Sequence, residues 1–149
     1  MTKLAIFAAG CFWGIEEKFL SHQGVLDTEV GYIGGITTDP SYHDVCSGET
    51  GHAEAVRVKF DEDVVSYEEL VGLFFEMHDP TTLNRQGPDI GTQYRSEIFC
   101  LDHDQYLIAD AKKRKFNKEI YNDKIVTSIS MAGNFWIAEE YHQKYVRKK

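Results

Sequence analysis

The stretch Leu4-Ala5-Ile6-Phe7-Ala8-Ala9-Gly10-Cys11-Phe12-Trp13-Gly14 predicts a strand that turns directly into a helix. Six apolar residues form the strand, Gly10 permits a sharp turn, and a helix-compatible run follows from Ile15 to Leu20. Cys11 is then expected at or beside a helix N-terminus, where free N–H groups and the helix dipole favour thiolate over thiol. From this pattern alone, a reactive thiol and an inert buried cysteine fit equally well.

The length of 149 residues predicts one domain, residues 1–149, with a single core. The chain is 42% hydrophobic and 27% charged with a net charge of -8, as is usual for a soluble globular protein. Basic residues cluster only in Lys112-Lys113-Arg114-Lys115 and Arg147-Lys148-Lys149. We therefore expect neither nucleic acid nor an anionic membrane as a partner.

The cysteines do not form a disulfide framework. Cys11, Cys46 and Cys100 are odd in number and lack the spacing of such a framework. The first residues are too short for a secretory signal peptide, and no apolar run reaches transmembrane length. We therefore expect a cytoplasmic protein with reduced thiols, and a monomer.

Hydrophobic periodicity and capping residues divide the chain into alternating strands and helices. Because the second and third strands follow one another without a helix, the sheet cannot be wholly parallel. The order β-α-β-loop-β-α-loop-β-α-β predicts an α+β fold, namely a ferredoxin-like plait with helices packed on a mixed sheet; the alternative is a three-layer α/β sandwich. After strand 4–9, strands are expected at 25–33, 53–60, 96–101 and 125–131, and helices at about 11–21, 66–77, 103–120 and 138–145.

Two long loops, 37–51 and 79–94, are expected to carry the function, because loops of about a dozen residues are unusual in compact domains unless they bind or catalyse. A zinc site is not expected, because His43, Cys46 and His52 lack a second Cys/His pair to complete four ligands. The reactive side chains in and beside the loops are Tyr42, His43, Cys46, His52, His78, Asp79, Gln86, Asp89 and Tyr94.

Six motifs resemble, in order and spacing, those of the type A peptide methionine sulfoxide reductases. The resemblance extends from about residue 4 to residue 146. Each motif alone is moderately specific, whereas six in register are close to decisive. The motifs are Gly10-Cys11-Phe12-Trp13-Gly14, Gly31-Tyr32-Ile33-Gly34-Gly35, Tyr42 with Val45-Cys46-Ser47-Gly48-Glu49-Thr50-Gly51-His52-Ala53-Glu54, His78-Asp79-Pro80, Gln86-Gly87-Pro88-Asp89-Ile90-Gly91-Thr92-Gln93-Tyr94-Arg95-Ser96, and Ala138-Glu139-Glu140-Tyr141-His142-Gln143-Lys144-Tyr145.

The resemblance implies reduction of the S epimer of methionine sulfoxide, free or in oxidised proteins, to methionine. Cys11 matches the family nucleophile, which attacks the sulfoxide sulfur and becomes a sulfenic acid. Phe12 and Trp13 match the aromatic residues that enclose the S-methyl group of the substrate. Sulfur and methyl groups gain from contact with aromatic faces.

The resemblance also implies how the sulfoxide oxygen is held. Glu54 matches the acid that protonates this oxygen, Tyr42 and Tyr94 match two phenols that bind it, and Asp89 matches a residue that orients the substrate. A sulfoxide sulfur is a poor electrophile until its oxygen is protonated or strongly hydrogen-bonded. We expect burial in the aromatic pocket to raise the pKa of Glu54 and keep its proton available.

Without the resemblance, the same residues also fit structural roles. Glu54 fits a surface carboxylate on a strand edge, Tyr42 and Tyr94 fit half-buried core residues, and Asp89 fits an Asx-turn. The competing functions are a cysteine hydrolase or peroxidase that uses Cys11, and a binding module for methionine sulfoxide or peptides without turnover. A hydrolase is disfavoured, because no His–Asn/Asp partner set for Cys11 is visible.

Many members of the family carry resolving cysteines in a Gly-rich C-terminal tail, and thioredoxin reduces the disulfide that these form. No cysteine follows Cys100 here, so resolution by such a tail is not expected. Cys100 lies in an apolar strand and is expected to be buried and inert, which leaves Cys46 as the candidate resolving residue. The favoured route is direct reduction of the Cys11 sulfenic acid by an external thiol (thioredoxin, glutaredoxin or glutathione, or dithiothreitol), with no bound cofactor or metal.

Overall fold

The computed structural model describes residues 1–149 and contains a six-stranded sheet in the order β7-β6-β1-β3-β2-β8. Strands β6 and β7 are parallel, and all other neighbours are antiparallel, so the sheet is mixed as expected. Its strands are β1 (Thr2–Ala9), β2 (Val25–Ile33), β3 (Ala53–Asp61), β6 (Ser96–Cys100), β7 (Ser128–Met131) and β8 (Trp136–Ile137).

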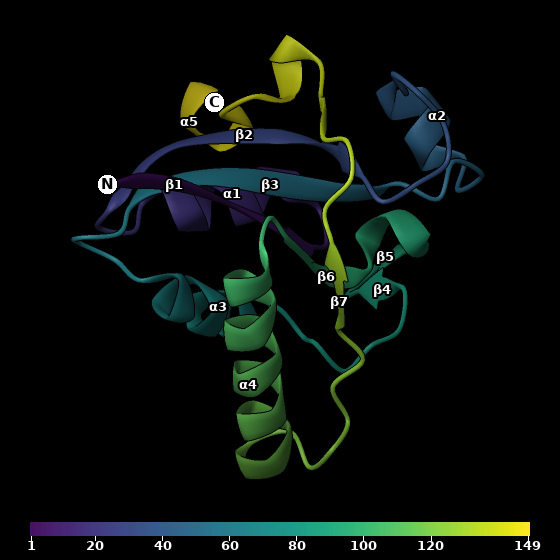
Figure 1. Ribbon diagram of the computed structural model, residues 1–149. Helices are drawn as coiled ribbons and strands as arrows, with labels where there is room; N and C mark the ends of the chain where they lie inside the picture. The colour runs from purple at the N-terminus through teal and green to yellow at the C-terminus, as the bar shows by residue number, and fades with distance from the viewer.

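Helices α1 and α3 connect the central strands in the β-α-β-β-α-β order of a ferredoxin-like plait. Figure 1 shows α3 and α4 beneath the strands, and α2 at the opposite end of the sheet from both chain termini. The α+β class with helices packed on a mixed sheet is therefore confirmed. The helices are α1 (Phe12–Leu20), α2 (Tyr42–Cys46), α3 (Tyr67–Glu76), α4 (His103–Glu119) and α5 (Tyr145–Lys148), with 3-10 turns η1 (Thr92–Tyr94) and η2 (Glu140–His142).

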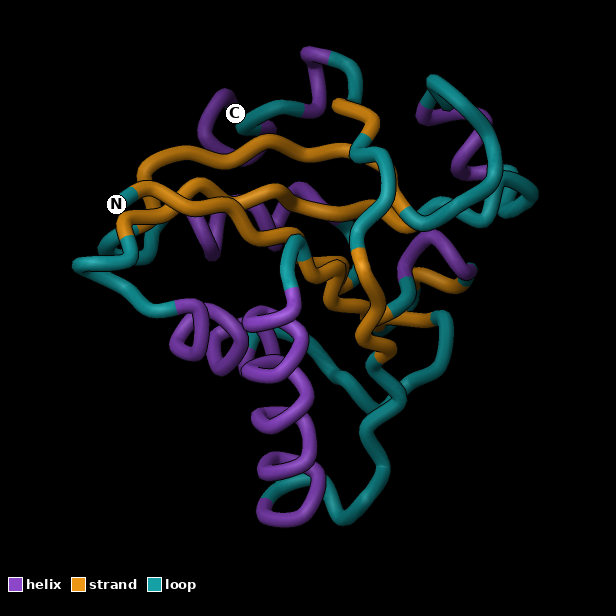
Figure 2. Tube along the Cα trace, in the orientation of Figure 1, coloured by secondary structure: helices purple, strands orange, loops and turns teal.

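From Ala5 to Ala9, strand β1 is buried on both of its faces, which explains the continuous apolar sequence of this part. On the helix side, the ring of Phe7 stacks on Phe19 at 5.0 Å and on Phe74 at 5.4 Å. On the other side, Ile6 and Ala8 belong to a smaller cluster, against which Ala132 and Phe135 pack. Figure 2 shows the teal segment between β7 and β8 that carries these two residues across the strands.

Both expected loops contain short regular elements that hydrophobic periodicity does not reveal. Helix α2 interrupts the first loop and begins with a capping box, in which the side chains of Ser41 and Asp44 each accept a hydrogen bond from the other residue's N–H. The second loop contains a hairpin of β4 (Arg85–Gln86) and β5 (Asp89–Ile90). These elements fix the course of both loops.

The expected helix at 138–145 is wrong, because this segment is hydrogen-bonded to the edge of β2. The Ala138 N–H donates to the Val30 carbonyl at 2.9 Å, and the Gln143 side chain bonds both the N–H and the carbonyl of Val30. Lys144 then adopts a left-handed φ of 54°, after which α5 begins. These tertiary bonds outweigh local helical propensity. The strand expected at 125–131 is also shorter, since β7 begins at Ser128.

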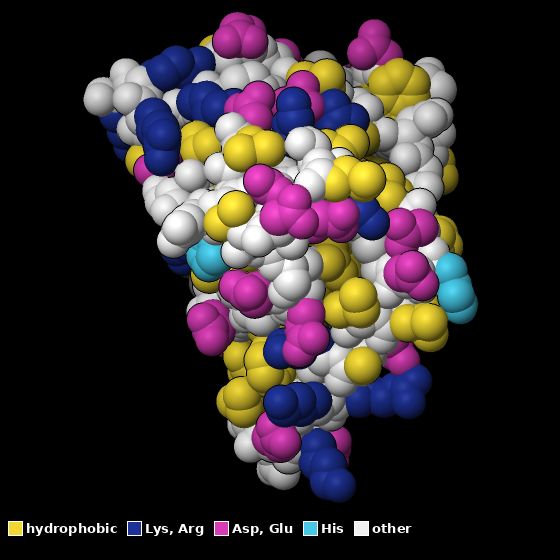
Figure 3. Space-filling model, turned by 60° about the vertical axis from the view of Figure 1, so that its left-hand side comes forward, with side chains coloured by type: hydrophobic (Ala, Val, Ile, Leu, Met, Phe, Trp, Pro, Cys, Tyr) yellow, Lys and Arg dark blue, Asp and Glu magenta, His cyan; other side chains and the backbone are white.

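Charged side chains of both signs are intermixed over the face seen in Figure 3, with Lys and Arg groups both along its upper edge and at its narrow lower end. Positive charge on this face is therefore local rather than continuous. No helix combines the length and the apolar composition needed to cross a membrane.

Candidate active site

Cys11 occupies the N-cap of α1, directly after β1, where the sequence predicts it. Its side chain is half-buried. The preceding Gly10 has a φ of 99°, and a Cβ atom there would lie 2.8 Å from the Gln86 side chain. The turn that presents Cys11 therefore requires a glycine, for backbone conformation and for space.

The preference for thiolate expected from the helix N-terminus is outweighed by burial in the protein without substrate. Burial raises the pKa of the Cys11 thiol, and the backbone hydrogen bond from Trp13 lowers it by less. The nearby Glu54, Asp89 and Cys46 raise the pKa further. Desolvation thus outweighs the helix N-terminus, and the resting thiol is held mainly in its neutral form.

Glu54 is buried on β3, with 1% of its surface exposed. Its Oε1 accepts a hydrogen bond from the Phe12 N–H at 3.3 Å, whereas its Oε2 is buried without a partner. Burial raises the pKa of Glu54 to about 7, with a smaller contribution from Asp89, against the lowering effect of the Phe12 N–H. The expected raised pKa is confirmed, and the alternative of a surface carboxylate is wrong.

Tyr42 on α2 and Tyr94 on η1 bring two phenols to this carboxyl from the two loops. Burial is the main cause that raises both phenol pKa values, and the charge of Glu54 adds to it in each case. The pKa of Tyr94 rises to about 12. Both phenols therefore stay protonated hydrogen-bond donors at neutral pH. The Tyr42 hydroxyl also lies beside the thiol of Cys46, one turn later in α2.

Asp89 on β5 completes the set that the sequence predicted. The side chain is half-buried, and its charge raises the pKa values of Cys11, Glu54 and Tyr94. The structure thus brings together the thiol, the carboxyl, the two phenols and Asp89, although they come from five separate elements.

Phe12 and Trp13 lie at the start of α1, the first buried and the second half-buried. The indole Nε1–H of Trp13 donates to Nδ1 of the buried His142 at 3.0 Å, and the indole ring stacks on Tyr145 at 4.0 Å. The His142 ring also lies 5.2 Å from Phe12 and 4.4 Å from Tyr42. His142 therefore has a hydrogen-bonding role, and it fixes the orientation of the indole ring.

Sequence reasoning gave no role to Glu139 or Tyr32, which lie next to this site. The Glu139 carboxylate accepts a hydrogen bond from the Tyr32 hydroxyl at 2.8 Å and another from the Tyr42 N–H at 2.9 Å. Both residues lie within motifs that carry the family resemblance. Their place in these motifs is the sequence feature that could have indicated a role at the site.

The other two cysteines differ sharply in exposure. Cys100 is fully buried on β6, 4.0 Å from the Tyr67 hydroxyl, as expected for an inert residue. Cys46 is exposed, and it is near enough to Cys11 to raise the pKa of that thiol. All three thiols are free.

His52 is engaged in structural hydrogen bonds rather than available as a metal ligand. Its Nδ1 accepts from the Gly35 N–H at 3.0 Å, and its Nε2 contacts the Thr37 carbonyl at 2.8 Å. No group of three His, Cys, Asp or Glu side chains is arranged to hold a metal ion.

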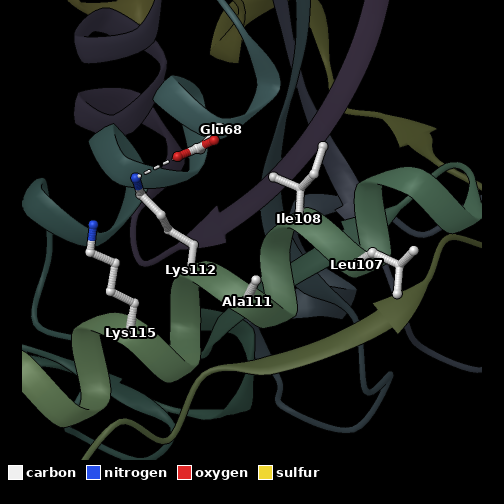
Figure 4. Close-up of a pocket in the computed structure, with 6 residues that line it drawn as sticks. All are labelled: Glu68, Leu107, Ile108, Ala111, Lys112 and Lys115. Atoms are coloured by element: carbon white, nitrogen blue, oxygen red, sulfur yellow. Dashed lines mark hydrogen bonds and ion pairs between the residues drawn. The ribbon is translucent and has the colours of Figure 1, made fainter.

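A separate groove between α3 and α4 lacks the chemistry of the cysteine site. Figure 4 shows its lining, in which Glu68 forms an ion pair with Lys112 at 3.2 Å. No thiol or phenol lines this groove, so it lacks the groups that the sequence predicts for the reaction. The lining residues are Glu68, Leu107, Ile108, Ala111, Lys112 and Lys115.

The Cys11 site combines a half-buried thiol with a carboxyl that keeps its proton near neutral pH, two phenol donors and an aromatic pair. These groups can attack one atom of a substrate while protonating an oxygen attached to it. The fold and site are therefore those expected of an enzyme that uses a cysteine together with an acid.

Comparisons with known proteins agree with this class. The family model described as peptide methionine sulfoxide reductase matches residues 3–149. The peptide methionine sulfoxide reductase MsrA of Methanothermobacter thermautotrophicus is 53% identical over 97% of this chain and 86% of its own length. The MsrA of Pelagibacter ubique is 49% identical over 99% of both chains.

Solved structures of similar proteins share the fold. Reduced Mxr1 from Saccharomyces cerevisiae matches with a TM-score of 0.94 and 38% identity, covering 99% of this chain and 86% of that one. Mxr1 in complex with Trx2 matches with a TM-score of 0.70 and 28% identity, over 97% and 84% of the two chains. The chain therefore belongs to the peptide methionine sulfoxide reductase family. It is an oxidoreductase that reduces methionine sulfoxide in proteins.

Proposed function

We propose that this enzyme reduces the S epimer of methionine sulfoxide, with Cys11 as the nucleophile and Glu54 as the proton donor. The observation that carries the proposal is the buried Oε2 of Glu54, which has no partner and belongs to a carboxyl with a pKa of about 7. A sulfoxide oxygen placed there would receive the missing hydrogen bond. A merely structural carboxylate would leave this oxygen unsatisfied at a cost of about 1–3 kcal/mol.

In the proposed reaction, the Cys11 sulfur attacks the sulfoxide sulfur while Glu54 protonates the sulfoxide oxygen. Tyr42 and Tyr94 donate hydrogen bonds to this oxygen as negative charge develops on it. The S–O bond of the substrate breaks and methionine leaves. The oxygen, with the proton from Glu54, remains as the sulfenic acid of Cys11, and the S–H proton of Cys11 restores the Glu54 carboxyl. The substrate sulfur is reduced by two electrons and the Cys11 sulfur is oxidised by two, so the step balances without a bound cofactor.

The same arrangement accounts for selectivity between epimers. The substrate sulfur carries an oxygen, a methyl group and the remainder of the methionine side chain. Phe12 and Trp13 would hold the methyl group, while Glu54 and the phenols hold the oxygen. With two substituents fixed and the sulfur facing Cys11, only one epimer directs its peptide toward solvent.

Turnover of the two epimers tests the proposal. Purified enzyme is incubated with dithiothreitol and either the S or the R epimer, and methionine is quantified. We expect methionine from the S epimer alone, and none from Cys11→Ser. No methionine from the S epimer, or equal turnover of both epimers, would overturn the assignment and favour a binding module or another cysteine chemistry.

We further propose that an external dithiol of the thioredoxin class regenerates Cys11. The complex of the relative Mxr1 with Trx2 supports this, as does the complete burial of Cys100. Two thiols reduce the sulfenic acid, so that water and a disulfide are released and the Cys11 thiol is restored. Cys46→Ser is expected to keep its turnover with thioredoxin, because regeneration by an external dithiol does not pass through Cys46. A collapse of turnover in Cys46→Ser would instead show an internal disulfide route.

Two further expectations stay predictions: action in the cytoplasm, and a monomer in solution. Free methionine sulfoxide as an additional substrate is proposed on the same grounds as the protein-bound one. The sulfoxide group is the part of the substrate that the predicted site residues would hold.

A further inference from the structure

The Glu139 carboxylate accepts a hydrogen bond from the backbone of Tyr42, one of the residues proposed to bind the substrate. We propose that Glu139 is a positioning residue, which holds the Tyr42 phenol in place for the sulfoxide oxygen. This inference rests on the proposed function of the same site, and it adds a residue from the segment between β8 and η2 to the machinery.

The Glu139 carboxylate is held by hydrogen-bond donors on two different elements. Its Oε1 accepts from the Tyr32 hydroxyl on β2, and its Oε2 accepts from the Tyr42 N–H at the start of α2. Burial opposes ionisation, but these bonds keep the pKa of Glu139 below its ordinary value. A charged acceptor makes both bonds stronger than neutral ones.

Tyr32 provides a rigid anchor for this bridge. Its side chain is fully buried, its ring lies 5.8 Å from Phe12, and it is the register partner of Glu54 across β2 and β3. One carboxylate oxygen is therefore tied to the strand pair that holds Glu54. The other oxygen sets where Tyr42 begins α2.

Tyr42 needs such an external constraint because α2 has only five residues and lies within a long connection. Its ring packs on His142 at 4.4 Å, and its backbone N–H bonds to Glu139. Both contacts come from the segment that continues from β8 into η2. The position of this phenol relative to Glu54 is therefore set by the C-terminal segment as well as by its own loop.

The test compares enzymes that keep both phenols with enzymes that keep one, because both phenols are proposed to donate to the same oxygen. Losing one donor leaves the other, so Glu139→Ala alone should lower kcat by less than about fivefold, within the value of one ordinary hydrogen bond. In a Tyr94→Phe background, where Tyr42 is the remaining phenol, Glu139→Ala should lower kcat by a further factor of about ten or more, as for a hydrogen bond to developing charge. In a Tyr42→Phe background it should have no further effect.

Matched variants separate positioning from folding. Glu139→Gln retains an oxygen that can accept from the Tyr42 N–H, so it should restore most of the kcat lost by Glu139→Ala in the Tyr94→Phe background. Glu140→Ala removes the exposed neighbouring carboxylate and should behave as the parent enzyme. Should Glu139→Ala not fold, Tyr32→Phe removes one of the two anchors and should give the same pattern with smaller losses.

The inference is overturned if Glu139→Ala lowers kcat by the same factor in the Tyr42→Phe and Tyr94→Phe backgrounds. It is also overturned if, in the Tyr94→Phe background, the kcat of Glu139→Gln is as low as that of Glu139→Ala. An unmutated enzyme that fails to reduce the S epimer would overturn the proposed function instead. The two failures are therefore distinguishable in one assay.

Discussion

Replacing Glu54 by Gln should make the stability of the protein less sensitive to pH, in a direction fixed by the buried carboxyl. The pKa of Glu54 is about 7 in the folded protein and 4.5 ordinarily. The folded state therefore binds the proton more tightly than the unfolded state. As pH rises through this interval, the unfolded state gives up its proton first, and stability falls.

The size of the effect follows from the two pKa values. One pKa unit corresponds to about 1.4 kcal/mol. Raising the pH from below 4.5 to above about 7 therefore lowers the free energy of unfolding by about 3 kcal/mol. Glutamine keeps the acceptor for the Phe12 N–H but does not titrate. The free energy of unfolding of Glu54→Gln, relative to that of wild type, should therefore increase by about 2–3 kcal/mol between pH 5 and pH 8.

Urea unfolding of both proteins across this pH range measures the difference. A comparison with wild type is needed because the half-buried His78 changes stability with pH in the opposite direction. Burial lowers the pKa of His78 from 6.5 to about 4, so its contribution to stability is lost as pH falls through that interval. His78 is present in both proteins and cancels in the difference. A difference that stays flat from pH 5 to pH 8 would refute the neutral, buried carboxyl.

Three further outcomes follow from the same contacts. Glu54→Gln should lower kcat on the S epimer by about a hundredfold to ten-thousandfold, the usual value of general acid catalysis, while alkylation of Cys11 proceeds at least as fast as in the parent, because a charge that raises the thiol pKa is removed. The kcat/KM of the parent enzyme should decline as pH rises above about 7, because Glu54 then lacks its proton, and a rate that rises steadily to pH 9 would contradict this. Gly10→Ala should destabilise the protein by about 1–3 kcal/mol in thermal or urea unfolding, whereas Gly14→Ala, with no atom within 4 Å of its new Cβ, should be neutral or stabilising.

The turn that carries Cys11 could be predicted because its signals are local. An apolar run, a glycine and a helix-compatible run follow each other directly, and the structure confirms all three. The protonation state of Cys11 could not be predicted in the same way. The helix N-terminus is visible in the sequence, but the burial that raises the thiol pKa comes from segments distant in the chain.

The burial of Glu54 was recognisable only through the family resemblance. Its neighbours Ala53 and Ala55 are also buried, so strand alternation does not place the side chain on the protected face. For the segment at 138–145, in contrast, the local sequence predicts the wrong structure. Its local composition favours a helix, but the bonds between Gln143 and Val30 become available only when β2 lies alongside. In both cases, contacts with segments distant in the chain determine the structure.

A single-turnover reaction shows whether Cys11 is the nucleophile that takes the sulfoxide oxygen. One equivalent of methionine-S-sulfoxide is mixed with the enzyme without reductant, and the protein is analysed by intact mass and by sulfenic-acid trapping with a dione probe. We expect one equivalent of methionine, a gain of one oxygen by the protein, and the trapped adduct on the peptide that contains Cys11. No methionine, or an adduct on a peptide without Cys11, would contradict this assignment. Loss of two hydrogens with a Cys11–Cys46 linked peptide would retain the nucleophile but overturn regeneration by an external thiol.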